Sequence, residues 1–319
     1  MSPETGSGLD RPPRVAVVIP CLNEERTIAK VVQDFRAELP EADIVVFDNG
    51  STDQTAEAAA EAGAILMSEK RRGKGFVVHA MFQKVDADIY IMVDGDDTYP
   101  ADRARALLEP VWRGEADMAI GSRIMAESSS EIKFLNWIGN NFFRRVINLI
   151  FRTNLTDILS GYRCMNRRLV KSLPLFVKGF EVEAEITIKS LERGFRLVEV
   201  PVDLRSRMEG SASKIRVLRD GLSILGTIFS LFRDYKPLTF FGSLGLMFLG
   251  LGLIPGAYAA FGAPALLQTL PLSSLMVSIA LILIGTLFIS VGLILHTVNR
   301  RFQEMEHLLQ LSDPWLEDR

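Results

Sequence analysis

The sequence is poor in the residues that build disulfide, zinc and histidine sites. Among its 319 residues are only two cysteines and three histidines. Two cysteines give neither a disulfide framework nor a four-ligand zinc site, so we expect Cys21 and Cys164 to be structural. No histidine is placed as a general base: His296 ends an apolar segment, His307 lies in the tail and His79 lies inside an expected helix.

Charge of either sign is missing from one long stretch near the C-terminus. The whole chain has a formal net charge of -3 and a pI near 5.8, which does not indicate a nucleic-acid-binding protein. Leu238 to Val298 contains no Asp, Glu, Lys or Arg, and these roughly sixty residues are enough for two membrane spans. We expect the spans at Leu238–Phe261 and Leu272–Val298, because soluble helices of this length usually keep a polar face.

The charges beside this stretch predict its orientation. Arg233, Lys236, Arg300 and Arg301 flank the two spans, whereas the segment between the spans has no charge. By the positive-inside rule both termini are cytoplasmic, and the chain is expected to be a multi-pass protein of the inner (cytoplasmic) membrane. Residues 1–13 are polar, contain Pro and Gly and lack an apolar core, which predicts a disordered leader rather than a signal peptide.

Apolar strand-like runs alternate with helical patterns in the first part of the chain. This alternation favours an α/β fold with a Rossmann-like, mostly parallel sheet covered by helices. The expected strands are Val15–Ile19, Ile44–Phe47, Ile65–Met67 and Ile89–Val93, with Met118–Ile120 as a fifth and Phe195–Leu204 as a late strand. The expected helices are Glu24–Leu39, Asp53–Ala62, Gly75–Val85 and Ala101–Trp112. Pro201 predicts that the late strand lies at a sheet edge.

Two segments have the composition of amphipathic helices that lie on a membrane surface. Residues 132–152 carry basic but no acidic side chains among many apolar ones, and residues 214–236 place apolar residues along one side. Packing into a protein core is the alternative for both. The predicted domains are an α/β domain over 14–213 that includes the first of these helices, a juxtamembrane helix over 214–236, a hairpin over 237–298 and a tail over 299–319.

Two carboxylates follow the expected strand Ile89–Val93. Asp94 and Asp96 end an apolar run, where α/β proteins bind ligands, and Gly95 between them lets the backbone curl. Their oxygens suit Mg²⁺ or Mn²⁺, and a divalent ion shared with substrate phosphates would stabilise a departing diphosphate. Taken alone, this motif is more often a simple acidic turn. The other motifs of the chain therefore determine whether it is a metal site.

Other polar groups follow the earlier strands. Asp48 ends the second strand and can accept hydrogen bonds from a nucleobase N–H and from ribose hydroxyls. The loop Arg71–Gly75 is basic and glycine-rich and precedes a helix, which suits phosphate. The loop lacks the spacing of a P-loop, which argues against a P-loop ATPase.

Short polar motifs follow one another along the chain in order. They are IPCLNEE (19–25), DNGSTD (48–53), RGKG (72–75), DGDDTYP (94–100), GSR (121–123) and SGYR (160–163), then GFEVE (179–183), VEVP (198–201) and RMEGSASK (207–214). The first six resemble an inverting family 2 glycosyltransferase with a GT-A fold. The last three resemble its dolichyl-phosphate mannose synthase-like branch, especially bacterial polyisoprenyl-phosphate glycosyltransferases that end in two spans. The resemblance covers about Val15 to Val298 and is carried by the ordered set.

The resemblance implies a donor site. Residues that would line the nucleoside pocket are Pro20, Leu22, Glu24 and Asp48. Asp94 and Asp96 would hold Mg²⁺ or Mn²⁺ against the donor diphosphate, and Gly95 would allow the close approach. Thr98 stands where some relatives place an amide side chain that helps to bind the metal.

The resemblance also implies a group of cations. Together with Asp96, the catalytic residues would be Arg123, Arg207 and Lys214, which would hold phosphate groups of the donor or the acceptor. Glu183 and Glu185 fall on a helix, where they either face the site or serve a structural role.

The implied enzyme moves one sugar, with inversion, from a nucleotide sugar to a polyprenyl phosphate at the cytoplasmic face of the membrane. Such an acceptor is already anionic at neutral pH and needs no strong general base. Two alternatives stay open: a saccharide or glycerolipid acceptor, for which Asp157 is the candidate base, and a non-catalytic membrane scaffold or flippase-associated subunit. The sequence does not choose among UDP-glucose, GDP-mannose and UDP-linked amino or acidic sugars as donor, and it leaves a homo-oligomer open.

Overall fold

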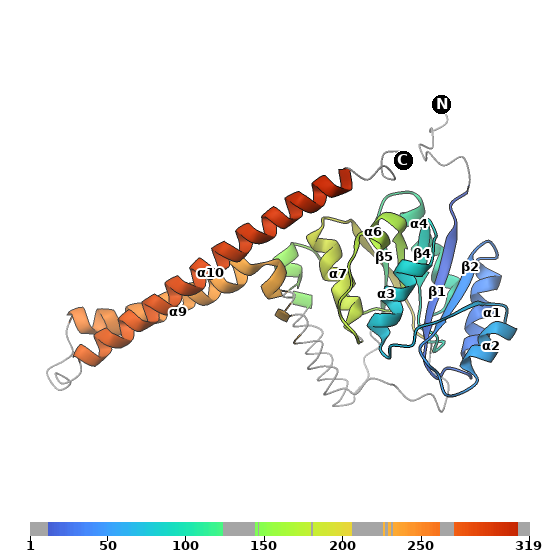
Figure 1. The fold of residues 1–319 in the computed structure, drawn as a ribbon, viewed down its shortest axis with the longest axis horizontal. Helices are drawn as coiled ribbons and strands as arrows, with labels where there is room; N and C mark the ends of the chain where they lie inside the picture. Colours follow the sequence, from blue (N-terminus) through green and yellow to red (C-terminus); the bar gives the residue numbers. More distant parts are fainter. Residues whose placement is uncertain are drawn as a thin grey trace. The chain divides into compact units, whose positions relative to one another are not determined.

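The chain folds into two compact units, Met1–Ile228 and Phe229–Arg319. The computed structural model describes residues 12–123, 144–145, 147–179, 181–205, 226, 229–230, 232–261 and 271–311. Within them the first unit is an α/β structure built on one sheet, and the second consists mainly of two long helices (Figure 1).

The sheet of the first unit is mixed and, over the described residues, has seven strands. Their spatial order is β3 (Ile65–Ser68), β2 (Asp43–Asp48), β1 (Val15–Cys21), β4 (Ile89–Met92), β6 (Arg163–Asn166), β5 (Met118–Arg123) and β7 (Leu197–Val202). β6 is antiparallel to both of its neighbours, β4 and β5, and the other neighbouring pairs are parallel. All strands except β6 therefore end at the same edge of the sheet.

Helices cover both faces of this sheet. α1 (Ile28–Glu38), α2 (Thr55–Glu61) and α4 (Ala104–Trp112), which follows the 3-10 turn η1 (Ala101–Arg103), pack against one face. α3 (Lys74–Lys84) connects β3 back to β4 and lies on the opposite face, as right-handed crossovers require. α6 (Arg167–Ser172) and α7 (Val182–Glu192) contact α3 there.

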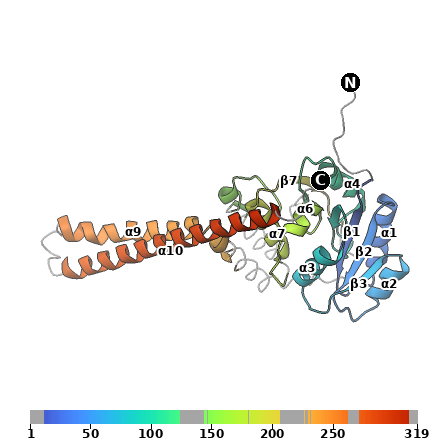
Figure 2. The same cartoon turned by 45° about the horizontal axis from the view of Figure 1, so that its top comes forward.

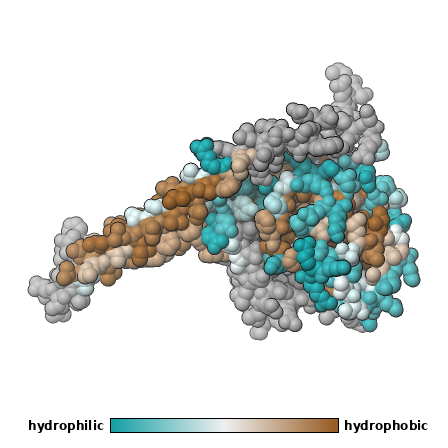
Figure 3. Space-filling model, in the orientation of Figure 1, coloured by the Kyte–Doolittle hydropathy of each residue, from teal (hydrophilic) through white to brown (hydrophobic). Residues whose placement is uncertain are grey.

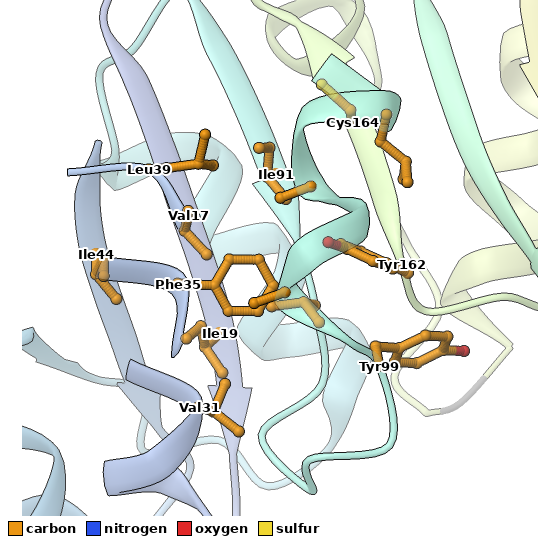
Figure 4. Close-up of a cluster of buried hydrophobic side chains, with 14 of the residues drawn as sticks. Val17, Ile19, Val31, Phe35, Leu39, Ile44, Ile91, Tyr99, Tyr162 and Cys164 are labelled. Atoms are coloured by element: carbon orange, nitrogen blue, oxygen red, sulfur yellow. The ribbon is translucent and has the colours of Figure 1, made fainter. Parts of the chain in front are cut away.

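Strand residues alternate between two buried faces. In β1, Val17 and Ile19 belong to the core beneath α1 and α4, and Val18 between them is equally buried on the other face. Figure 4 shows Phe35 of α1 beside Val17 and Ile19, and its ring meets that of Tyr162 edge-on at 6.1 Å between centroids. Burial on both faces explains why β1 and β4 are continuous apolar runs in the sequence.

The α/β fold predicted from the sequence is confirmed, with one strand unforeseen. β6 has the sequence RCMN, which lacks an apolar alternation, and only its neighbours on both sides make it a strand. The late strand is β7, whose place at the end of the strand order agrees with Pro201. The helix expected from Glu24 begins at Ile28, because the N–H groups of Thr27 and Ile28 both close a turn on the Glu24 carbonyl.

The two predicted amphipathic helices lie largely outside the described residues. Of the segment 132–152, residues 144–145 and 147–151 are helical. Of the segment 214–236, residues 226, 229–230 and 232–235 are helical. Most of the predicted leader, 1–13, and the end of the tail, 312–319, are also outside the described residues.

Two long apolar helices form the second unit. α9 (Pro237–Phe261) and α10 (Pro271–Leu311) lie side by side in both ribbon views (Figures 1 and 2). Pro237–Ala257 and Leu272–Phe302 are long and apolar enough to cross a membrane, and only 22% and 17% of their most apolar windows are buried. Apolar side chains make up most of the visible surface of the two helices (Figure 3). This exposure argues against a soluble core helix and suits a lipid bilayer.

Glycines let the two helices approach closely. A Cβ placed on Gly245 would lie 2.7 Å from the carbonyl oxygen of Gly285, and a Cβ on Gly285 would lie 2.8 Å from that of Gly245. Ser278 donates a hydrogen bond to the carbonyl oxygen of Gly252 at 2.7 Å. Small side chains at the contact are typical of helix pairs in membranes, where close van der Waals packing drives association.

Replacing Gly285 by leucine should therefore separate α9 from α10. The new side chain would collide with the backbone of Gly245, and forced overpacking of this kind typically costs about 1–3 kcal/mol. Gly250→Leu is the control, because a Cβ at Gly250 meets nothing within 4 Å. Thermal unfolding of the detergent-purified proteins, followed by circular dichroism, should show a lower melting temperature for G285L only. Equal melting temperatures of G285L and G250L would contradict the close packing of α9 against α10.

Candidate active site

The carboxyl edge of the sheet brings the predicted donor-site residues together. The register places Cys21 of β1 beside Asp48 of β2, and Asn49 N donates to the Cys21 carbonyl at 2.9 Å. Val93, directly after β4, donates to the Val18 carbonyl of β1 at 3.2 Å. The ends of β1, β2 and β4 are thus adjacent, and they carry Pro20, Leu22, Glu24, Asp48, Asp94, Gly95 and Asp96.

The loops after β1 and β2 are tied to each other. Both oxygens of Asp48 face its own turn, where Gly50 N and Ser51 N donate to them at 3.1 Å. Glu24 N donates to Thr55 Oγ1 at 2.7 Å, at the start of α2. Thr52 N donates to Asn23 Oδ1 at 2.8 Å. The two loops therefore form one rim beside the end of β4.

The turn after β4 holds the second carboxylate in place. Asp96 is 8% exposed, and its Oδ1 accepts hydrogen bonds from Thr98 Oγ1 at 2.6 Å and from Thr98 N at 3.2 Å. A Cβ on Gly95 would lie 2.5 Å from the Cys21 sulfur, so only glycine fits between Asp94 and Asp96. Thr98 thus orients Asp96 through its own hydroxyl and amide groups.

The first carboxylate is held by a buried lysine. Lys74 Nζ lies 2.6 Å from Asp94 Oδ1 and 2.5 Å from Glu183 Oε1, and its side chain is 11% exposed. Burial by itself lowers the pKa of Lys74, but the charges of Asp94 and Glu183 outweigh burial and raise that pKa above its usual value. A Cβ on Gly161 would lie 2.5 Å from Asp94 Oδ2, so the carboxylate is confined between Lys74 and Gly161.

The loop Arg71–Gly75 differs from the phosphate cradle that its sequence suggested. Lys74 turns towards Asp94 and Glu183, and Gly75 N, at the start of α3, donates to the Lys178 carbonyl at 3.1 Å. A Cβ on Gly73, where φ is +134°, would lie 2.2 Å from the same carbonyl oxygen. The glycines therefore allow close backbone packing rather than the approach of a ligand.

Arg123 ends β5 at the same edge and is paired with an aspartate. Its Nε and Nη2 lie 2.5 and 2.8 Å from the two oxygens of Asp157, and Arg123 N donates to the same carboxylate at 3.2 Å. Burial lowers the pKa of Arg123, and the hydrogen bonds and charge of Asp157 raise it by more. Arg123 is therefore cationic at all ordinary pH values, and its guanidinium is fixed in orientation.

Two glutamates of α7 support this site from behind. Glu183 is buried and reaches Lys74. Glu185, also buried, accepts hydrogen bonds from Phe176 N at 3.0 Å and Val177 N at 3.1 Å and pairs with Lys189 at 2.7 Å. Glu183 thus pairs with Lys74, which also holds Asp94, and Glu185 positions the loop before α7.

Arg163 of the SGYR motif has a structural role. It is fully buried, and it donates to the Ser160 carbonyl, the Ile158 carbonyl and Thr187 Oγ1, each at 2.8 Å. Burial lowers its pKa to about 10. Arg163 therefore fastens the loop after Asp157 to α7.

Most, but not all, of the residues predicted for the site are among the described residues. Arg207 and Lys214 lie outside the described residues. Lys74 and Asp157 were not expected as charge partners of Asp94 and Arg123, although both stand in or beside the motifs RGKG and SGYR. Cys21 and Cys164 are buried thiols that are not joined to each other in a disulfide, and burial raises the pKa of Cys164 above its usual value, as expected of structural thiols.

The carboxylates fit a metal that is shared with a substrate. In the described part of the chain, no group of three or more His, Cys, Asp or Glu side chains could hold a metal ion. Asp94 and Asp96, the two carboxylates predicted to bind the metal, follow β4 at the carboxyl edge, and Asp96 is buried and held in a fixed orientation by Thr98. Hard oxygen ligands in that small number suit Mg²⁺ or Mn²⁺ completed by water and phosphate oxygens.

Comparison with known proteins decides the family. The glycosyl transferase family 2 sequence model matches residues 16–173. Glycosyltransferase AglJ of Haloferax volcanii is 34% identical over 251 residues, which cover 78% of this chain and 82% of that protein. The chain belongs to glycosyl transferase family 2. The family assignment confirms the expectation from the ordered motifs and makes the chain a glycosyltransferase rather than a non-catalytic scaffold.

Two further likenesses are informative about this family 2 glycosyltransferase. The undecaprenyl-phosphate mannosyltransferase of Micrococcus luteus is 28% identical over 216 residues, covering 62% of this chain and 86% of that protein. Glucosyl-3-phosphoglycerate synthase of Mycobacterium tuberculosis, solved in complex with Mn²⁺ and UDP-glucose, superposes with a TM-score of 0.57 and 22% identity, covering 69% of this chain and 79% of that one. The second likeness confirms the GT-A fold.

Proposed function

We propose that the protein is an inverting hexosyltransferase that moves one sugar from a nucleotide sugar to a polyprenyl phosphate at the cytoplasmic face of the membrane. The observation that carries the proposal is the arrangement at the sheet edge, where Asp94 and Asp96 follow one strand and the fixed cation Arg123 ends another. The exposed apolar pair α9 and α10 supports an acceptor that resides in the bilayer. Relatives named for dolichyl-phosphate and undecaprenyl-phosphate transfer support the same acceptor class.

The donor is placed by the loops after β1, β2 and β4. Pro20, Leu22, Glu24 and Asp48 line the nucleoside end, and Asp94 and Asp96 lie where the diphosphate would come. A Mg²⁺ or Mn²⁺ ion bound by these carboxylates would neutralise charge on the departing nucleoside diphosphate. Lys74 and Glu183 keep Asp94 in position, and Thr98 does the same for Asp96.

Transfer needs cations more than it needs a base. An oxygen of the acceptor phosphate attacks the anomeric carbon from the face opposite the leaving group, and the bond to the donor diphosphate breaks with its electron pair going to the diphosphate. No proton has to be removed, because the attacking phosphate is already ionised. Arg123, together with Arg207 and Lys214, holds the phosphate groups and lowers the repulsion between two anions.

The surroundings of Asp157 disfavour a neutral hydroxyl acceptor. A saccharide or glycerolipid would need a general base, and Asp157 was the candidate. Asp157 is 3% exposed, and its oxygens accept hydrogen bonds from the Arg123 side chain, Arg123 N and Leu159 N. Both oxygens of this carboxylate are therefore already occupied by donors of the protein itself, which leaves it poorly placed to take a proton from a hydroxyl and favours the phosphate acceptor.

The function is tested with the purified full-length protein in detergent. Undecaprenyl phosphate is incubated with a panel of radiolabelled nucleotide sugars, with UDP-glucose and GDP-mannose as the first donors. We expect one donor to give a labelled lipid product, loss of the product with EDTA and recovery with Mg²⁺ or Mn²⁺. Labelling of a saccharide or glycerolipid but not of the prenyl phosphate would refute the proposed acceptor.

The membrane topology gives a separate prediction. Because only the flanks of the hairpin carry Lys and Arg, Asp10 and Asp313 should be cytoplasmic and Gln268 should face the other side. Each position is replaced in turn by cysteine in intact cells, where the native Cys21 and Cys164 are buried and should not react. An impermeant maleimide should label position 268 only. Labelling of position 313 from outside would refute the hairpin.

A further inference from the structure

A glutamate of the VEVP motif holds the loop that bears Asp157. Val198 and Val200, on either side of Glu199 in β7, pack against the core beneath α1 and α4, so Glu199 faces the other side of the sheet. Thr156 N donates to both Glu199 oxygens at 2.8 Å, Thr156 Oγ1 donates to Oε2 at 2.9 Å, and Asp157 N donates to Oε1 at 2.8 Å. One half-buried carboxylate thus accepts both donors of Thr156 and the backbone N–H of Asp157.

A second contact ties the same loop to the end of β5. The Ser122 and Thr156 hydroxyl oxygens lie 2.6 Å apart, and Ser122 is the donor because the Thr156 hydroxyl hydrogen is directed at Glu199. Ser122 directly precedes Arg123, whose side chain pairs with Asp157. The position of Asp157 relative to Arg123 is therefore set from β7 and β5 together.

Side chains rather than a backbone ladder define the path of this loop. Residues 153–162 contain neither helix nor strand. Their N–H groups must find other partners, and several of these are side chains. Leu155 N donates to Asn148 Oδ1 at 3.0 Å, and Gly161 N donates to the Tyr99 hydroxyl at 3.1 Å. Glu199 has the same function at Asp157, the residue of the loop that reaches Arg123.

Asp157 occupies only one edge of the Arg123 guanidinium. It accepts from Nε at 2.5 Å and from Nη2 at 2.8 Å, and among the described residues it is the only hydrogen-bond acceptor of this side chain. The two hydrogens of Nη1 and the second hydrogen of Nη2 form the other edge of the planar group. The side chain is 29% exposed, so this edge can meet two oxygens of a phosphate group, in a direction that Asp157 fixes.

We propose that Glu199 is a positioning residue: by holding the backbone of Asp157, it directs the second edge of Arg123 at a phosphate group of a substrate. The inference rests on the proposed function, in which Arg123 holds a phosphate group. That group belongs to the donor diphosphate or to the prenyl phosphate, which offer the same oxygen acceptors. Glutamine at position 199 keeps the size of the side chain but replaces one acceptor oxygen by an NH₂ group, which cannot accept the N–H groups of the loop. Asp157 then shifts, and Arg123 turns with it.

The test is a double-mutant cycle on the full-length protein in detergent with Mg²⁺ present. Its variants are Glu199→Gln, a pair variant that joins Arg123→Gln to Asp157→Asn, and the combination of all three changes. The pair variant removes both charges, so that neither is left buried without its partner. Dissociation constants are measured for a short-chain prenyl phosphate and for UDP and GDP.

We expect the pair variant to weaken binding of one of the two ligand classes by roughly 10–100-fold, as the loss of a hydrogen bond to a charged group does. That class identifies whether Arg123 holds the donor or the acceptor phosphate. Glu199→Gln alone should weaken binding of the same class by roughly fivefold, a typical coupling within one hydrogen-bond network. Added to the pair variant, Glu199→Gln should change the affinity by less than about twofold, because the cation that it positions is gone.

Glu109→Gln is the matched control. Glu109 is an exposed glutamate of α4 that pairs with Arg113, and the control makes the same chemical change away from the loop. We expect this variant to bind both ligand classes as wild type does.

The outcomes separate the inference from the proposed function. If Glu199→Gln weakens binding equally with and without the Arg123–Asp157 pair, its role is structural and the inference is wrong. Wild-type affinity of Glu199→Gln for both ligand classes would also overturn the inference, and in both cases the proposed function stands. A pair variant that binds both classes as wild type does would show that Arg123 holds no phosphate, which removes that step of the proposed function together with the inference.

Discussion

Replacing Asp96 by alanine should lower the rate of sugar transfer by roughly 10²–10³-fold while leaving the protein folded. The Asp96 residue is 8% exposed, and its carboxylate accepts two hydrogen bonds from Thr98. These bonds fix the position of the carboxylate at the carboxyl edge of the sheet. In the proposed reaction, negative charge develops on the departing diphosphate at this place. Alanine removes a metal-binding group there without introducing a larger side chain.

The effect of Asp96→Ala is measured as turnover at saturating donor and acceptor in a buffer with fixed free Mg²⁺. Asp102→Ala serves as the control. Asp102 is an exposed aspartate in η1, the short 3-10 helix that follows the turn containing Asp96. This control should turn over like wild type. Wild-type-like turnover of Asp96→Ala itself would falsify the metal-binding role.

Replacing Lys74 by methionine should destabilise the first unit and also abolish most of the activity. The change leaves Asp94 and Glu183 facing each other without their common cation, and Glu183 has only 4% of its side chain exposed. Removing one partner of a buried ion pair typically costs about 3–5 kcal/mol. At roughly 2–4 °C per kcal/mol for a unit of this size, the melting temperature should fall by about 6–20 °C.

A second substitution separates the stabilising role of Lys74 from its positioning role. In the double variant Lys74→Met with Glu183→Gln, one of the two uncompensated charges is gone, and much of the melting temperature should return. Activity should stay low, because Asp94 still lacks the ammonium group that holds it. Lys84→Met, at the exposed end of the same helix, should change neither property. Full activity of the double variant would show that Lys74 serves stability alone.

Much of the fold was predictable because it depends on neighbouring residues in the sequence. The runs that form β1, β2, β3 and β4 are apolar and bounded by polar turns, and β1 and β4, which are buried on both faces, need such runs. The absence of charge over Leu238–Val298 likewise identified α9 and α10, since a lipid-facing helix tolerates few charges. β6 could not be predicted in this way, because its four residues become a strand only between β4 and β5.

The sequence by itself also determined which side chains end the strands: Asp48, Asp94, Asp96 and Arg123 each follow an apolar run, and parallel strands bring their carboxyl ends to one edge. Only the tertiary structure decided what these side chains meet. The loop Arg71–Gly75 was expected to suit phosphate, and its Lys74 pairs with Asp94 and Glu183. Asp157, the candidate base for a hydroxyl acceptor, pairs with Arg123. The physical reason is that a buried charge needs a partner of opposite charge or a hydrogen-bond partner. That partner comes from whichever segment the fold places beside the charge, even when the segment is distant in the sequence.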